Sequence, residues 1–167
     1  MKILFFLVAA FTMTSCSTTI YLVRHGEKAA ADGTMMTSDP ALSTAGQQRA
    51  AALKDSLAAK HLSQIFATEF KRTQQTVQPT AEAKTLTTTI YKAAKSDSLI
   101  LALTNHKGKN YLVAGHSNTV PAMLRKIGFT VSDIPETDFD NFFTVKIRWF
   151  FGRKMQLVKA TYGAATN

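Results

Sequence analysis

The chain has 167 residues, of which 46% are hydrophobic and 19% are charged, with only eight Gly and four Pro. This length and composition fit one globular domain and exclude a disordered chain, a collagen-like repeat and a coiled coil. A single cysteine excludes an internal disulfide and a zinc knuckle. The 20 basic residues outnumber the 11 acidic ones, which gives a formal charge of +9 and favours anionic partners.

The N-terminus is predicted to be a targeting segment outside the fold. A charged start precedes an apolar run at residues 3–11, and small residues lead on to Cys16. The run is shorter than the ~20 residues that span a bilayer. The pattern resembles a bacterial lipoprotein signal, although Met13 stands where leucine is commonest. We therefore expect a signal peptide at 1–15 and a domain at 16–167.

Cys16 is the expected lipidation site, which implies an exported chain in the cell envelope. The lipid would hold the protein at a bacterial membrane, on its periplasmic side or at the cell surface. Ordinary secretion without a lipid and a retained apolar anchor are the two alternatives.

From residue 20 onward, short apolar runs alternate with amphipathic segments. Four strands are predicted at 20–23, 65–67, 87–91 and 111–114. Four helices are predicted after an N-cap at Ser43, over 72–83, after an N-cap at Ser96, and over 120–127. Residues 142–149 and 155–161 are typical of a hairpin, and the last five residues of a frayed tail. This order predicts an α/β domain, a three-layer α/β/α sandwich with a mostly parallel sheet.

Polar residues follow two of the predicted strands directly. Arg24-His25-Gly26-Glu27 follows the first strand, and Gly115-His116-Ser117-Asn118-Thr119 follows the fourth. Ligands of open α/β sheets bind at the carboxyl ends of the strands. The two histidines are therefore expected to converge on one site.

These two segments, with Thr68-Glu69-Phe70-Lys71-Arg72-Thr73 after the second strand, resemble the histidine phosphatase (phosphoglycerate mutase-like) superfamily. Leu42-Ser43 with Gly46 adds to the resemblance, which covers residues 20–148. It implies a phosphoglycerate mutase-like fold and a phosphatase that works through a phosphohistidine, with no metal or cofactor. The substrate would be a phosphomonoester or a protein phosphohistidine.

The resemblance implies a role for each matching residue, and each role suits phosphoryl transfer. His25 would be the nucleophile, because a neutral imidazole can accept a phosphoryl group. Arg24 and Arg72 would clamp phosphate oxygens with their planar guanidinium groups. His116 would stabilise the transition state, and Ser117 and Asn118 would complete the substrate-binding site. Every residue to which the resemblance assigns one of these roles is present in this sequence.

A carboxylic acid that protonates the leaving oxygen is usual in the family, but its position varies. Residues 87–95, where the mutases carry it, contain no acidic residue. Glu27, Glu69 and Asp140 are the candidates, although each is more often structural. This departure disfavours a mutase. It leaves open a leaving group that needs little help, such as the imidazole of phosphohistidine.

Other classes of function fit the sequence less well. The basic residues form no long run, which disfavours nucleic acid as a partner, and no HExxH motif indicates a metal. Ser117 lacks the final glycine and the following histidine of a serine hydrolase. The main alternative is a catalytically silent phosphate-binding or interaction module on the same fold. The partner is expected to be a small phosphorylated substrate or a phosphoprotein, because no insertion between Arg72 and His116 would form a lid.

Overall fold

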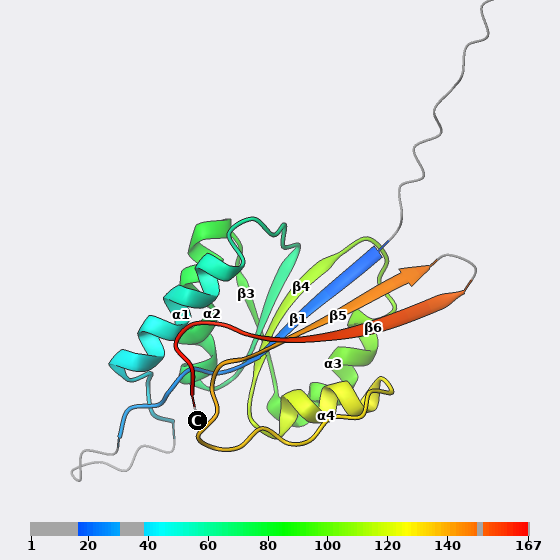
Figure 1. Cartoon of the computed structure of the whole chain (residues 1–167). Coiled ribbons are helices and arrows are strands. Elements are labelled where there is room, and N and C mark those ends of the chain that lie inside the picture. Colours follow the sequence, from blue (N-terminus) through cyan, green and yellow to red (C-terminus); the bar gives the residue numbers. More distant parts are fainter. Residues whose placement is uncertain (1–16, 31–38, 150–151, 167) are drawn as a thin grey trace, which may run out of the picture.

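In the part of the chain that the structure describes, six strands form one sheet in the order β3-β2-β4-β1-β5-β6 (Figure 1). The computed structural model describes residues 17–30, 39–149 and 152–166. The strands are β1 (Ser17–Arg24), β2 (Gln64–Thr68), β3 (Thr88–Tyr91), β4 (Asn110–Gly115), β5 (Asn141–Trp149) and β6 (Arg153–Thr161). The helices are α1 (Thr44–Ser56), α2 (Lys71–Lys84), α3 (Ser96–Leu103) and α4 (Thr119–Lys126), with a 3-10 turn, η1 (Ala93–Lys95), before α3.

The direction of the strands decides which loops meet. Strands β1 to β4 are parallel, and β5 and β6 add an antiparallel hairpin beside β1. The carboxyl ends of β1, β2 and β4 therefore lie at the same edge as the start of β5. Loops that follow three strands and the loop that precedes a fourth can all contribute to one site.

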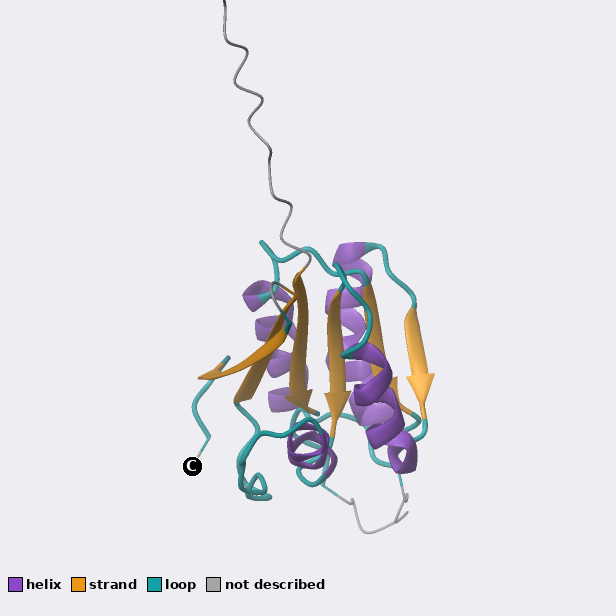
Figure 2. Ribbon diagram, turned by 90° about the vertical axis from the view of Figure 1, so that its right-hand side faces the viewer, coloured by secondary structure: helices purple, strands orange, loops and turns teal. Residues whose placement is uncertain are grey.

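The alternation of side chains along β1 builds two cores. Ile20 and Leu22 pack on the side of α3 and α4, whereas Tyr21 and Val23 pack on the side of α1 and α2. All four side chains are buried, because helices cover both faces of the sheet (Figure 2). The predicted three-layer α/β/α sandwich is confirmed.

The start of β1, the start of α3 and the C-terminus differ from the sequence predictions. β1 begins at Ser17 rather than at residue 20, and Ser96 is the first residue of α3 rather than its cap, because η1 leads directly into that helix. The prediction of a frayed tail is wrong, since the Thr166 backbone N–H donates to Asp140 (3.1 Å) and its hydroxyl accepts from Phe139 N–H (2.9 Å). The predicted signal peptide and Cys16 lie outside the described residues.

Candidate active site

A hollow of about 360 Å³ opens at the carboxyl edge of the parallel strands. Its lining residues are His25, Lys28, Arg72, His116, Ser117, Asn118 and Glu136. The structure thus brings together both predicted histidines, one predicted arginine and both predicted binding residues. Arg24 lies beneath this lining, with 2% of its surface exposed.

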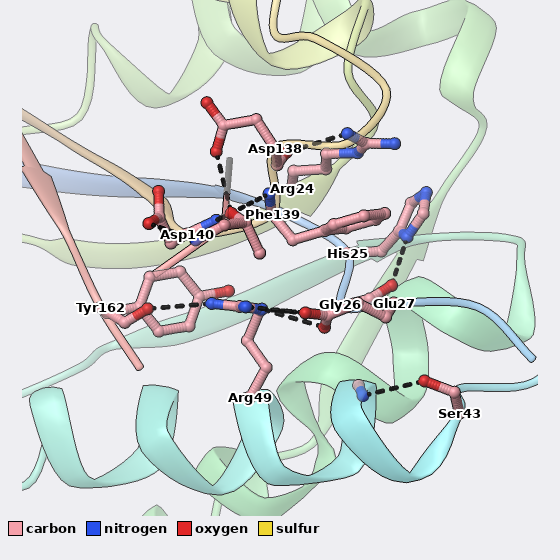
Figure 3. Close-up of polar contacts among 12 residues, drawn as sticks. Arg24, His25, Gly26, Glu27, Ser43, Arg49, Asp138, Phe139, Asp140 and Tyr162 are labelled. Carbon is pink, nitrogen blue, oxygen red and sulfur yellow. Dashed lines mark hydrogen bonds and ion pairs between the residues drawn. The ribbon is translucent and has the colours of Figure 1, made fainter. Parts of the chain in front are cut away.

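His25 lies at the floor of the hollow and is only 5% exposed. Its Nδ1 lies 2.7 Å from the carbonyl oxygen of Gly26 (Figure 3). A carbonyl can only accept, so Nδ1 carries the proton and Nε2 keeps a free lone pair. Burial lowers the pKa of His25 to about 3, and the charges of His116, Arg72 and Arg24 act in the same direction. The ring is therefore neutral at neutral pH, as a nucleophile must be.

The backbone around His25 is held by short hydrogen bonds and by close packing against another backbone segment. Its own N–H donates to the carbonyl of Gly115 at 3.0 Å, and the N–H of Gly26 donates to Thr76 Oγ1 at 2.9 Å. Helix α1 approaches so closely that a Cβ on Gly46 would lie 2.2 Å from the carbonyl oxygen of Glu27. A glycine is required there because two backbone segments touch.

His116 lies edge-on to His25, with ring centroids 5.3 Å apart. Its Nε2 is 3.1 Å from Thr68 Oγ1, which is 2.8 Å from Thr73 Oγ1. The Thr73 hydroxyl donates to the Phe70 carbonyl at 2.7 Å, so the Thr68 hydroxyl donates to Thr73 and accepts from His116. Nε2 therefore carries the proton of the neutral ring.

Burial and the nearby Arg72 charge lower the pKa of His116 to about 4. The ring is thus neutral in the free protein, with a lone pair on Nδ1. A bound phosphoryl dianion favours the charged ring, because an opposite charge raises the pKa of an imidazole. His116 can then donate from Nδ1 to a phosphoryl oxygen while Nε2 stays on Thr68.

The two arginines are held in different ways. Nη1 of Arg24 donates to the carbonyls of Pro135 (2.7 Å) and Asp138 (2.9 Å), and Nη2 donates to Glu136 at 2.8 Å. Its buried Nε–H has no hydrogen-bond partner among the described residues. Arg72 is more open, 16% exposed, with Nη1 3.5 Å from Asp39. Arg72 therefore keeps donors open to an anion in the hollow, whereas the donor of Arg24 left unpaired in the described part of the chain is the buried Nε–H.

Aromatic rings fix the planes of these side chains. The Arg24 guanidinium lies 4.0 Å from the ring centre of Phe139, which also packs against His25 (Figure 3). The Arg72 guanidinium lies 4.5 Å from the ring centre of Phe70, which forms a T-shaped pair with His116. Stacking on an aromatic face stabilises a guanidinium in one orientation, which prepares its donors for a planar or tetrahedral anion.

Three residues of the candidate site were not predicted from the sequence. Lys28 and Glu136 line the hollow, and Phe139 packs beneath it. Glu136 and Phe139 lie in the loop between α4 and β5, which has no motif and no regular period. Only the topology could have indicated these two residues, because a strand that pairs antiparallel with β1 must begin at the edge of the sheet where His25 lies.

The three carboxyl groups predicted as candidate acids do not line the hollow. Glu27 is paired with buried Arg49, whose Nε and Nη2 lie 2.7–3.0 Å from the carboxylate (Figure 3). Asp140 accepts the Thr166 backbone N–H at 3.1 Å, and Glu69 accepts that of Ala93 at 2.8 Å. All three serve structural contacts in the free protein.

A larger hollow of about 690 Å³ runs along α2 and the start of β3. Its lining is mainly glutamine and threonine and includes neither histidine nor arginine, so it offers no comparable chemistry. Within the described ranges, no group of three or more His, Cys, Asp and Glu side chains is placed to hold a metal ion.

Residues 20–95 match the family described as the histidine phosphatase superfamily (branch 1). No curated protein matches the chain. This match spans less than half of the chain, so it shows a similarity to that superfamily over residues 20–95.

Solved structures share the fold at low sequence identity. A mycobacterial glucosyl-3-phosphoglycerate phosphatase is 14% identical, with 88% of this chain and 100% of that chain covered and a TM-score of 0.65. The protein histidine phosphatase SixA, solved with tungstate, is 16% identical over 86% of this chain and 96% of that chain, with a TM-score of 0.65. A candidate phosphohistidine phosphatase SixA from Agrobacterium tumefaciens is 20% identical, with coverages of 87% and 97% and a TM-score of 0.59. These likenesses establish the architecture.

Proposed function

We propose that the protein is a metal-independent phosphatase that hydrolyses phosphomonoesters or protein phosphohistidine through a phosphohistidine at His25. One observation carries the proposal. His25 is buried, neutral and fixed by Gly26 in the tautomer that leaves Nε2 unprotonated, at the floor of a hollow lined by Arg72 and Lys28. A nucleophile among cations is the arrangement that phosphoryl transfer requires.

The reaction has two balanced steps. In the first, Nε2 of His25 forms a bond to phosphorus, the bond from phosphorus to the leaving oxygen breaks, and that oxygen takes up a proton. In the second, a water oxygen attacks phosphorus, the P–N bond breaks with its electron pair returning to Nε2, and phosphate leaves with the two protons of the water. The proton stays on Nδ1 of His25 and is donated to the Gly26 carbonyl throughout. Arg24, Arg72 and charged His116 stabilise the equatorial oxygens in both steps.

The small hollow supports a substrate that is recognised mainly through its phosphate. The structure describes every residue between Arg72 and His116, and this stretch holds only the rest of α2, then β3, η1, α3 and β4, with no inserted element to form a lid. This suits a broad phosphomonoesterase or a phosphohistidine phosphatase. Two structural neighbours are described as phosphatases of glucosyl-3-phosphoglycerate and of protein histidine, which is consistent with either class.

The test is a phosphatase screen with His25→Ala as the matched variant. Wild-type protein should turn over p-nitrophenyl phosphate and become labelled by a radioactive phosphoester, and His25→Ala should do neither. A chelator should leave the rate unchanged. Activity that survives in His25→Ala and is lost with chelator would overturn the mechanism. Wild-type protein that binds phosphate without turnover would identify the silent binding module instead.

We also propose that a lipid on Cys16 holds the protein at a membrane of the cell envelope. The sequence pattern of residues 1–16 supports this, and β1 begins directly after it, at Ser17. No helix within the described residues has the length and apolar character needed to cross a membrane. Metabolic labelling with a fatty acid tests the proposal, and Cys16→Ser should abolish the label.

A further inference from the structure

The first step of the proposed reaction needs a proton at the leaving oxygen, and the two histidines are poorly placed to give one, since a charged His116 directs its Nδ1 proton to an equatorial oxygen. The Nδ1 proton of His25 is held by the Gly26 carbonyl, and the Nε2 proton of His116 is held by Thr68. An alkoxide is a poor leaving group, so a general acid typically contributes ~100-fold or more. The donor must be another group in the hollow.

Glu136 is the one carboxyl group that lines the hollow, as far as the described residues show. Oε2 accepts from Arg24 Nη2 at 2.8 Å, and Oε1 accepts from the Ser117 hydroxyl at 2.5 Å. The hydrogen bond from Ser117 and, to a lesser extent, the charge of Arg24 hold the pKa of Glu136 below its usual range in the free protein. The carboxylate is thus ionised and paired with Arg24, a cation that a bound phosphate would also contact.

Depth in the hollow places Glu136 on the side of the leaving group. The Glu136 side chain is 76% exposed, whereas His25 is 5% exposed at the floor. In-line attack by His25 directs the leaving oxygen away from the floor and toward solvent. The Glu136 carboxyl therefore lies at the rim, where the scissile oxygen emerges.

Arg24 links phosphate binding to the release of Glu136. Its Nε–H and Nη2–H point to the same side of the guanidinium and can hold two oxygens of one anion. Glu136 occupies only Nη2, and the buried Nε–H has no partner among the residues described. A phosphoryl group can satisfy both donors, so it displaces the carboxylate from Arg24.

We propose that Glu136 is the catalytic residue that protonates the leaving oxygen, an inference that rests on the proposed phosphatase function. The proton enters with the monoanionic phosphate ester, whose second pKa is about 6. It passes from a phosphoryl oxygen to the displaced carboxylate, and from there to the leaving oxygen as the P–O bond breaks. In the second step the carboxylate takes a proton from the attacking water and passes it to an oxygen of the departing phosphate, which restores the ionised carboxylate.

The experiment compares two aryl phosphates in the whole protein. Phenyl phosphate releases a phenol with a pKa of about 10, which needs a proton, whereas 2,4-dinitrophenyl phosphate releases a stable anion. In Glu136→Gln, kcat/KM should fall ~100-fold or more for phenyl phosphate and less than ~3-fold for the dinitrophenyl ester. Glu69→Gln, which removes a carboxylate outside the hollow, should lower neither value.

An equal loss for both esters would show that Glu136 only positions Arg24 or Ser117, and no loss for either would show that it is idle. Each of these results overturns the inference and leaves the proposed function standing. Wild-type protein that turns over neither ester would overturn the proposed function itself. A wild-type kcat/KM for phenyl phosphate that falls above about pH 6, and a flat profile in Glu136→Gln, would support the proton route described.

Discussion

The contact between Gly46 and Glu27 predicts that a single added methyl group will disturb the nucleophile. In Gly46→Ala the new Cβ would lie 2.2 Å from the Glu27 carbonyl oxygen, whereas real Cβ atoms are essentially never found within 3.0 Å. Helix α1 or the loop that carries His25 must therefore move by about 0.8 Å. A displacement of about 1 Å in a reacting group can lower the rate ~100-fold.

Two effects of this substitution on stability oppose each other, so the sign of the change in the free energy of unfolding shows which one prevails. Helix propensity alone predicts that Gly46→Ala stabilises the protein by about 1 kcal/mol. Overpacking against an unyielding backbone typically costs about 1–3 kcal/mol, and we expect it to prevail because the contacted atoms belong to the main chain.

The assays for Gly46→Ala are urea unfolding and kcat/KM with p-nitrophenyl phosphate. We expect lower stability and a kcat/KM reduced by at least ~10-fold. Gln48→Ala, on the exposed side of the same helix, is the control and should change neither. A Gly46→Ala protein with raised stability and unchanged kcat/KM would refute the view that this contact positions His25.

Three further substitutions or conditions test the site. Arg72→Lys keeps the positive charge but loses the two parallel N–H donors of the guanidinium, so kcat/KM should fall at least ~10-fold, which corresponds to about 1.4 kcal/mol. An unchanged kcat/KM would show that Arg72 is only a surface cation. Arg49→Met leaves the Glu27 carboxylate without its ion-pair partner and should lower the free energy of unfolding by about 3 kcal/mol. Adding Glu27→Gln should restore most of this loss, and a loss below ~1 kcal/mol in Arg49→Met would contradict the prediction. Because the folded pKa values of His25 and His116 are depressed to about 3 and about 4, their contribution to stability is complete above about pH 6.5. It should fall below that pH by up to ~1.4 kcal/mol per unit for each ring, until the pH reaches the folded pKa values. Urea unfolding at pH 7 and pH 5 should show a smaller loss when both rings are replaced by Gln, and equal losses would count against buried neutral histidines.

Short-range patterns in the sequence were enough to predict much of the fold. The apolar run at 20–23 and the cap at Ser43, whose hydroxyl accepts from Gly46 N–H at 3.1 Å, both lie where local chemistry predicts them. The two histidines converge because each follows a parallel strand, and that relation is visible in the chain order. The predicted positions depended on neighbours within a few residues, so they needed no tertiary information.

Long-range pairing explains what the sequence did not reveal. Glu27 is held by Arg49, 22 residues further along the chain, and Glu136 is held by Arg24 across 112 residues. Neither pairing has a local signature, so the acid candidates were chosen by residue type alone. The tail was expected to fray for the same reason, since only the folded loop at 138–140 supplies partners for Thr166.

The uneven charge of the molecule bears on its proposed orientation at a membrane. The amino ends of the parallel strands lie beside the loops 57–63 and 104–109 and the paired ends of β5 and β6. These segments carry the exposed cations Lys60, Lys107, Lys109, Arg148, Arg153 and Lys154, and residues 57–63, 104–109, 146–149 and 152–156 contain no acidic residue. Each cation near an anionic bilayer contributes about 1 kcal/mol of attraction. The basic end thus favours contact with anionic lipid.

If Cys16 is lipidated, this basic end must face the bilayer, because β1 begins there at Ser17. The eight residues of β1 at about 3.3 Å each put His25 more than ~20 Å away, beyond the ~8 Å Debye length at physiological salt. The hollow then opens toward soluble substrates. We therefore expect equal kcat/KM for a soluble phosphoester with the lipidated protein in anionic vesicles and with a chain that begins at Ser17. Lys107→Glu with Lys109→Glu should weaken vesicle binding of the latter and leave kcat/KM unchanged. A large loss of activity on anchoring, or a strong preference for phospholipid head groups, would show that the hollow faces the membrane.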